Sequence, residues 1–119
     1  MDSRPKTLFI DIDGTLLFHY GMGIKQAIMP LKVLPGVIEK LDEWDRKNYK
    51  IVLITGRKES TRQITENQLQ YLGITYDYLV MGIGGGKRVL INDTKPNSIF
   101  PTAEAICIER NKGLENLDI

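Results

Sequence analysis

The residues that could do chemistry follow short apolar runs along the chain. Asp11 and Asp13 come directly after one such run, Thr55 follows a second, and Lys87 and Asp93 follow later ones. Ligands of open α/β sheets bind outside the carboxyl ends of the strands. We therefore expect these five side chains to converge on one rim.

Their chemistry is coherent. Neighbouring carboxylates repel one another and need a cation, and hard oxygen ligands with room for water and phosphate suit Mg²⁺. A hydroxyl and an ammonium group hold phosphate oxygens and stabilise the charge of phosphoryl transfer. A carboxylate also serves as a nucleophile that forms an aspartyl phosphate. The residue types predict a magnesium-dependent site for phosphate.

The elements that must position this rim alternate between short β-rich runs and helical stretches. This pattern predicts an α/β domain with a doubly wound, Rossmann-like, mostly parallel sheet of five strands. The expected strands are 7–10, 51–54, 78–81, 89–91 and 105–108, and the expected helices are 36–47 and 60–72. Ser60 with Gln63 resembles a capping box, and Gly73 stands where a helix ends. Trp44 and Cys107 are expected in the core.

Length and composition bound the class of protein. The 119 residues, 42% of them hydrophobic, are enough for one core, so we expect a single domain over 1–119 with a short flap at 14–35. The 16 basic and 15 acidic residues leave a net charge of +1, which argues against a dominant attraction to nucleic acid or membrane. Without a long apolar run or a signal peptide, the expected setting is cytoplasmic.

The motifs resemble those of a known family. Asp11-Ile12-Asp13-Gly14-Thr15-Leu16 resembles the first motif of the haloacid dehalogenase superfamily of phosphotransferases, and Ile54-Thr55-Gly56-Arg57 resembles the second. Lys87 and Asn92-Asp93 resemble the third and fourth. The resemblance extends from residue 7 to about residue 108, in the family's order and spacing.

The resemblance implies a magnesium-dependent phosphomonoester hydrolase. Asp11 would attack phosphorus, and Asp13 would protonate the leaving group and then deprotonate water. Asp11, the main-chain carbonyl of Asp13, and Asp93 would hold Mg²⁺. The groups that bind the phosphoryl oxygens would be those of Thr55, Gly56 and Lys87.

Two departures from the family pattern bear on function. Asn92 stands where the fourth motif usually offers a second acidic residue, which removes one carboxylate from the metal's surroundings. No segment is long enough for a cap domain, so the chain resembles a capless member. Such members act on large substrates or use a neighbouring subunit to cover the site. A sugar phosphate and a phosphorylated polynucleotide end are both open as substrates, and the near-neutral charge favours the first.

Other interpretations stay open. A catalytically weak binding or scaffold protein on the same fold is one alternative, motivated by Asn92. A receiver-like phosphoacceptor module is disfavoured, because no isolated Asp ends the third expected strand, where Met81-Gly82 stands. His19 is interpreted as a surface residue of the flap. Arg57 either contacts substrate or is a solvated or salt-bridged arginine.

Overall fold

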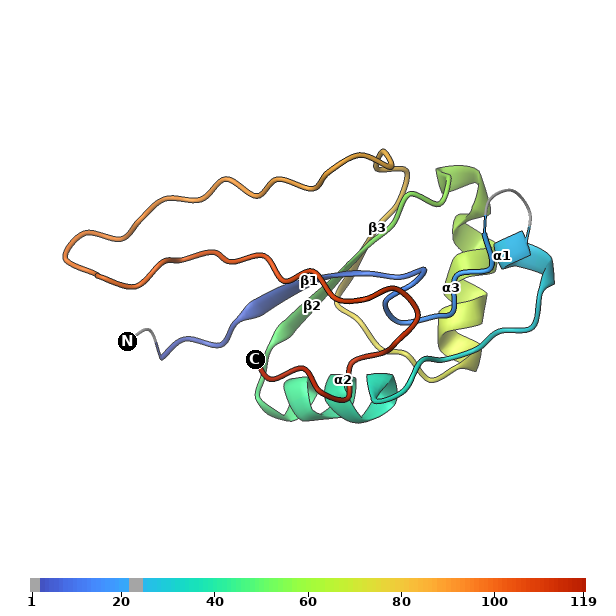
Figure 1. Ribbon diagram of the computed structural model, residues 1–119, viewed down its shortest axis with the longest axis horizontal. Coiled ribbons are helices and arrows are strands. Elements are labelled where there is room, and N and C mark those ends of the chain that lie inside the picture. The colour runs from blue at the N-terminus through green and yellow to red at the C-terminus, as the bar shows by residue number, and fades with distance from the viewer. Residues whose placement is uncertain (1–2, 22–24) are drawn as a thin grey trace.

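The computed structural model describes residues 3–21 and 25–119 and shows an α/β fold around a parallel sheet (Figure 1). The sheet has the order β1-β2-β3, with β1 at Thr7–Asp11, β2 at Lys50–Ile54 and β3 at Tyr78–Val80. Register pairs Asp11 with Ile54 and Ile54 with Val80. The carboxyl ends of all three strands therefore meet at one rim.

Two helices connect the strands. Helix α2, Val37–Arg46, joins β1 to β2, and helix α3, Arg62–Tyr71, joins β2 to β3 after the short 3-10 turn η1, Glu59–Thr61. The predicted helices are confirmed. No helix among the described residues is long and apolar enough to cross a membrane.

Both helices pack on the same face of the sheet. Ile10 and Leu53 are partners in register and belong to one buried cluster with Trp44 of α2 and Leu69 of α3. Trp44 is 1% exposed, which confirms its predicted place in the core. One cluster therefore holds the sheet and both helices together.

The opposite face of the sheet is left largely uncovered. Phe9, Val52 and Tyr78 are in register and so point to this side, as does Val80, two residues after Tyr78. Phe9 is 54% exposed and Tyr78 64%, whereas Val52 is buried. Parallel sheets usually have both faces covered. We call these four residues the open face.

The sheet has three strands in the part of the chain that the structure describes, instead of the five predicted. Residues 89–91 and 105–108 lie in an extended excursion, 84–108, without regular secondary structure. A parallel strand needs a crossover of about a dozen residues, usually a helix. Only residues 81–88 separate β3 from the fourth expected strand, and three of them are consecutive glycines. We call residues 84–108 the arm.

Three smaller predictions have different outcomes. Helix α3 is capped by Thr61 without a side-chain bond, so the predicted capping box at Ser60 is wrong: the chain enters α3 through η1. Gly73 has φ +75° and its N–H donates to the Gln70 carbonyl, as a helix-ending glycine does. Cys107 is exposed, because the strand expected to bury it does not form.

The flap at 14–35 is a short, irregular excursion, as predicted. Leu17 forms isolated β-bridges with Asp13 and Val33, and helix α1, Lys25–Ile28, is a single turn. Residues 22–24 lie outside the described part. The flap therefore adds no cap domain among the described residues.

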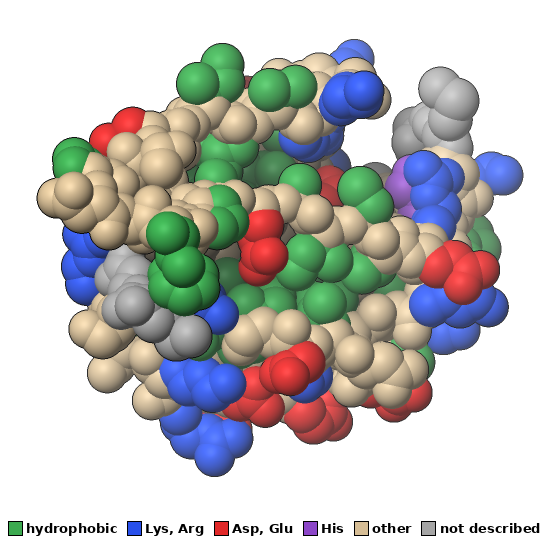
Figure 2. Space-filling model, turned by 60° about the vertical axis from the view of Figure 1, so that its left-hand side comes forward, with side chains coloured by type: hydrophobic (Ala, Val, Ile, Leu, Met, Phe, Trp, Pro, Cys, Tyr) green, Lys and Arg blue, Asp and Glu red, His purple; other side chains and the backbone are tan. Residues whose placement is uncertain are grey.

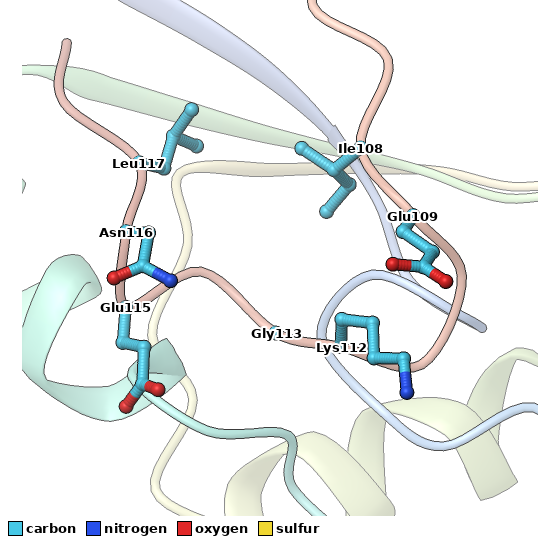
Figure 3. Close-up of a pocket in the computed structure, with 7 residues that line it drawn as sticks. All are labelled: Ile108, Glu109, Lys112, Gly113, Glu115, Asn116 and Leu117. Atoms are coloured by element: carbon cyan, nitrogen blue, oxygen red, sulfur yellow. The ribbon is translucent and has the colours of Figure 1, made fainter.

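The segment after the arm returns to the body. Leu114 is buried, and its N–H donates to the Pro35 carbonyl at 2.8 Å. Gly113 has φ +86°, and a Cβ there would collide with Pro35. A pocket of about 240 Å³ opens within this segment, between residues 108 and 117 (Figure 3). None of the predicted site residues lines that pocket.

Candidate functional site

Asp11, Asp13 and Thr55 lie at the rim as the sequence predicts. Asp11 ends β1, and Thr55 follows β2, which is the neighbouring strand. Thr55 is 2% exposed; its N–H donates to the Val80 carbonyl at 3.0 Å, and its hydroxyl accepts the Arg57 N–H at 3.1 Å. The backbone around Thr55 is therefore held by both β3 and its own hydroxyl.

Asp13 is engaged by Arg57 across the rim. Arg57 Nε donates to Asp13 Oδ2 at 2.8 Å, and Nη2 donates to Oδ1 at 2.7 Å. The two side chains are only 11% and 13% exposed. A forked, shielded pair of this kind fixes the carboxylate in both position and orientation.

Further polar side chains hold this pair. Arg57 Nη1 donates to Gln68 Oε1 at 2.6 Å and to the hydroxyl of Thr65, both on α3. Gln26, on α1, donates to Asp13 Oδ1 at 2.8 Å. The network thus ties the flap, the end of β1 and helix α3 to one carboxylate.

Asp11 is placed differently from Asp13. Its nearest side-chain donor is the Thr15 hydroxyl, at the long distance of 3.5 Å. Burial, followed by the charge of Asp13, raises the pKa of Asp11, while the positive charge of Arg88 acts in the opposite direction. Asp11 is thus a half-buried carboxylate whose negative charge is disfavoured until a cation or an electrophile approaches.

The structure does not gather the third predicted metal ligand. Asp93 lies on the arm, pairs with Lys95 at 3.0 Å and has a 65% exposed side chain; the hydrogen bond from Lys95 lowers the pKa of Asp93. Within residues 3–21 and 25–119, no group of three or more His, Cys, Asp or Glu side chains could hold a metal ion. The rim alone offers the carboxylates of Asp11 and Asp13.

The predicted phosphate-binding residues beyond Thr55 have separate places. Gly56 lies close to the arm's root, because a Cβ there would stand 3.2 Å from the Ile83 carbonyl. Lys87 is exposed on the arm. Its neighbour Arg88 donates to the carbonyls of Gly84 and Gly86, and Arg88 is the cation whose charge reaches Asp11. The glycine run, residues 84–86, lies in a loop without regular secondary structure.

The loop after the first motif is fixed by a residue far along the chain. The Asn111 side chain accepts the His19 N–H at 2.8 Å and donates to the His19 carbonyl at 3.2 Å. Its own N–H donates to the Gly14 carbonyl at 2.8 Å. Asn111 adopts φ +64°, a conformation that Asn tolerates better than most residues. His19 is part of this clamp, so the loop at 14–19 is held at both of its ends.

Sequence reasoning missed several of these residues. Gln26, Gln68 and Asn111 are single amides without a motif, and the contact between Asn111 and His19 spans 92 positions. One feature of the sequence points to Arg57 as a site residue, namely its place directly after the Thr55-Gly56 pair. In the structure Arg57 forms a salt bridge with Asp13, and a contact with substrate stays a prediction.

Comparisons with known proteins find likeness in structure. No protein-family model matches the chain, and no curated protein matches it. The fold is similar to a chain of the Pnkp1/Rnl/Hen1 complex, with a TM-score of 0.58 and 30% identity over 73% of this chain. A second structure, of the Pnkp1/Rnl/Hen1 RNA repair complex, matches with a TM-score of 0.57 and 30% identity over 71% of this chain.

The extent of the match differs between neighbours. The similarity covers 31% and 28% of the two chains from those complexes, so this chain spans about a third of their length. A crystal structure of a protein from Vibrio cholerae matches with a TM-score of 0.52 and 22% identity, over 73% of this chain and 79% of that one. The chain therefore has an α/β fold that is shared by a part of an RNA repair assembly and by a smaller bacterial protein.

Proposed function

We propose that this chain is a phosphomonoester hydrolase of the haloacid dehalogenase superfamily that acts on phosphorylated polynucleotide ends. The observation that carries the proposal is the rim itself, where Asp11 lies beside the Arg57-held Asp13 and next to buried Thr55. A carboxylate nucleophile, a second oriented carboxylate and a hydroxyl are the groups that phosphoryl transfer through an aspartyl phosphate requires.

The reaction divides between the two carboxylates. An Asp11 oxygen forms a bond to phosphorus as the bond to the leaving oxygen breaks, and Asp13 gives that oxygen a proton. Water then attacks the phosphorus of the aspartyl phosphate, its proton goes to Asp13, and phosphate leaves as Asp11 is restored. Thr55, already at the end of β2, donates to the phosphoryl oxygens.

The oxygen atoms at the rim are of the chemical type that binds Mg²⁺. Mg²⁺ is commonly held by one or two carboxylates, with water and substrate phosphate completing its coordination. Asp11 supplies a carboxylate whose charge is destabilised by burial and then by Asp13, and the main-chain carbonyl of Asp13 is two residues along the chain. Bound there, the ion would neutralise charge on the transferring phosphoryl group. Asp93 lies outside this set in the structure.

A polymer end is favoured as substrate by two observations. The flap leaves the rim without a cap domain among the described residues, so a large substrate has access. The likeness at 30% identity to a chain from an RNA repair complex supports a phosphorylated nucleic-acid end more than a free sugar phosphate. The near-neutral charge by itself favours a sugar phosphate, but contact with an end, which presents few phosphates, needs less positive charge than binding along a duplex.

Phosphate release from a matched panel tests the proposal. RNA oligonucleotides with a 3′- or a 5′-phosphate are compared with sugar phosphates, with and without Mg²⁺. We expect release from one oligonucleotide end, dependence on Mg²⁺, and loss of release in Asp11→Asn. Asp42→Asn is the control, because Asp42 is an exposed residue of α2 that pairs with Arg46. Release from sugar phosphates alone would contradict the substrate, and no release from any phosphomonoester would contradict the activity.

A further inference from the structure

The side chain of Arg110 lies across the loop that follows the first motif. A Cβ on Gly14 would stand 3.2 Å from Cγ and 3.6 Å from Nε of Arg110, so the stem of the arginine crosses the glycine. The same Cβ position is 3.7 Å from Cβ of His19. Arg110 and His19 are far apart in the sequence, and they meet here beside the residue that directly follows Asp13.

Both side chains carry hydrogen-bond donors that no protein group uses. Arg110 is exposed and forms no hydrogen bond or ion pair with its side chain among the residues that the structure describes. His19 Nδ1 accepts the Gly21 N–H at 3.0 Å, so the neutral ring carries its proton on Nε2. Nε2 has no acceptor within the described part of the chain and is not among its buried unpaired atoms, so solvent reaches it. A guanidinium and a ring N–H are therefore available to a ligand.

Asn111 fixes the backbone beneath both groups. It directly follows Arg110, and its N–H donates to the Gly14 carbonyl at 2.8 Å, while its side chain holds the N–H and the carbonyl of His19. Figure 2 shows basic side chains at the surface on the side of the molecule where the histidine lies. A site whose backbone is held before the ligand arrives loses less entropy on binding. We call Arg110 and His19 the donor pair.

The place of the donor pair beside Asp13 decides which part of the substrate it meets. In the proposed reaction Asp13 gives its proton to the leaving oxygen, so groups next to Asp13 lie on the leaving-group side of the phosphorus. When the substrate is a polynucleotide end, the leaving group is the polymer itself. Its nearest negative charge is the phosphodiester that adjoins the terminal phosphate. Arginine binds such a group through two parallel N–H donors, and a ring N–H adds a third.

We infer that Arg110 and His19 bind the phosphodiester that adjoins the terminal phosphate, and that they thereby favour a polymer end over a phosphate ester with no second negative charge. The inference rests on the proposed function, because it takes the polymer as the leaving group. Arg57 is not available for this role, since its guanidinium is held by Asp13 and by side chains of α3. A single contact of this kind is compatible with the net charge of +1.

Kinetics with matched substrates test the inference. A phosphorylated RNA oligonucleotide is compared with an aryl phosphate and with the same oligonucleotide carrying an uncharged methylphosphonate as the linkage next to the terminal phosphate. We expect Arg110→Gln to raise KM for the charged oligonucleotide about tenfold relative to KM for the aryl phosphate, with the effect on KM and not on kcat. The methylphosphonate should raise the KM of the wild type by the same factor, and Arg110→Gln should add nothing to that increase.

Lys112→Gln is the matched control for charge. It removes the same charge two residues farther along the chain, from an exposed side chain that lines the pocket of Figure 3. We expect no change in the ratio of the two KM values. An equal increase in both variants would mean that only the overall charge matters, and independent effects of Arg110→Gln and the methylphosphonate would mean that Arg110 binds another group. Either result would overturn the inference.

The chain has one histidine, which gives a readout that does not depend on turnover. In Asp11→Asn, proton–nitrogen NMR of the imidazole should show a shift of the His19 Nε2 signal when the phosphorylated oligonucleotide is added, and a smaller shift with the methylphosphonate. An unchanged signal at saturating oligonucleotide would overturn the inference even if the wild type releases phosphate from oligonucleotides. A shifted signal without phosphate release from any substrate would contradict the proposed activity and leave the donor pair as a binding site.

Discussion

Arg57 grips Asp13 through two parallel hydrogen bonds, Nε to Oδ2 at 2.8 Å and Nη2 to Oδ1 at 2.7 Å, in a place where both side chains are nearly buried. Asp13 Oδ1 also accepts from Gln26, so both oxygens of the carboxylate are engaged. Oδ1 accepts two of these bonds and Oδ2 accepts one, which leaves a lone pair of Oδ2 free to take a proton. Arg57 therefore sets both the position and the orientation of the Asp13 carboxylate.

Removal of Arg57 is expected to destabilise the fold, because it leaves the shielded carboxylate of Asp13 without its cationic partner. We expect Arg57→Ala to lower the free energy of unfolding by about 3 kcal/mol, the usual cost of breaking a buried pair. Adding Asp13→Asn should recover part of this loss, since the uncompensated charge is then gone. Urea denaturation of the two single variants and the double variant measures the coupling.

The control for this prediction is Arg62→Ala. Arg62 also pairs with a carboxylate, that of Glu59 at 2.8 Å, but both groups are substantially exposed. An exposed pair contributes little to stability, because water and salt screen its charges. If Arg57→Ala costs no more than Arg62→Ala, the Asp13 pair does not contribute as a buried one.

Asp13→Asn should separate the two steps of the proposed reaction. An aryl phosphate leaves without a proton, so Asp11 should still be phosphorylated at a rate close to that of the wild type. Hydrolysis of the aspartyl phosphate should slow by about 10²–10⁴, because no base activates water. Stopped-flow traces should show a burst of about one phenolate per enzyme and then a stall. Equal slowing of both steps, without a burst, would leave Asp13 as an orienting residue only.

Asp11→Asn should stabilise the fold while it abolishes turnover. Burial and the neighbouring Asp13 raise the pKa of Asp11, so the folded state takes up its proton more readily than the unfolded state. Asp11 thus costs the fold most stability above its folded pKa, and the cost disappears as the pH falls through that pKa to the unfolded value. Melting temperatures across acid to neutral pH should show a gain for Asp11→Asn that fades with acid.

Asp93→Asn is the counterpart for the pH experiment. Lys95 lowers the pKa of Asp93. Any contribution of Asp93 to the stability of the fold is therefore favourable, opposite in sign to that of Asp11, and is lost as the pH falls through the folded pKa of Asp93. Because Asp93 is exposed, that contribution is small. A gain for Asp93→Asn as large as that for Asp11→Asn would show that the effect does not come from burial at the rim.

Asn111 should control the order of the loop that follows the first motif. Asn111→Gly keeps the positive φ but removes both side-chain bonds to His19, and we expect a loss of about 2 kcal/mol. Asn111→Ala should lose about 1 kcal/mol more, because φ +64° strains Ala. Hydrogen exchange of the His19 amide, measured alongside denaturation, should accelerate in both variants. Unchanged protection of that amide would refute the clamp.

The elements that are set by local pattern could be predicted from the sequence. The apolar run before Asp11 forms β1, and the spacing of Val37, Leu41 and Trp44 forms the buried stripe of α2. The rim positions of Asp11 and Thr55 follow from the same reasoning, because parallel strands end together.

The features that could not be predicted depend on contacts between residues that lie far apart in the sequence. Val89 and its neighbours have the composition of a strand, but a strand needs an edge to pair with and a connection long enough to reach it. The Asn111 clamp joins residues that no local pattern links. Asp93 was assigned by its order in the sequence, and its place on the arm depends on how residues 84–108 are packed.

The clamp between Asn111 and the loop after the first motif has a consequence for biosynthesis. His19 leaves the ribosome 92 residues before its partner, which at roughly 5–20 residues per second is a delay of roughly 5–20 s. During that interval the loop that follows Asp11 and Asp13 lacks its tether to Asn111. The hydrogen bonds that close this loop can therefore form only after translation has passed Asn111.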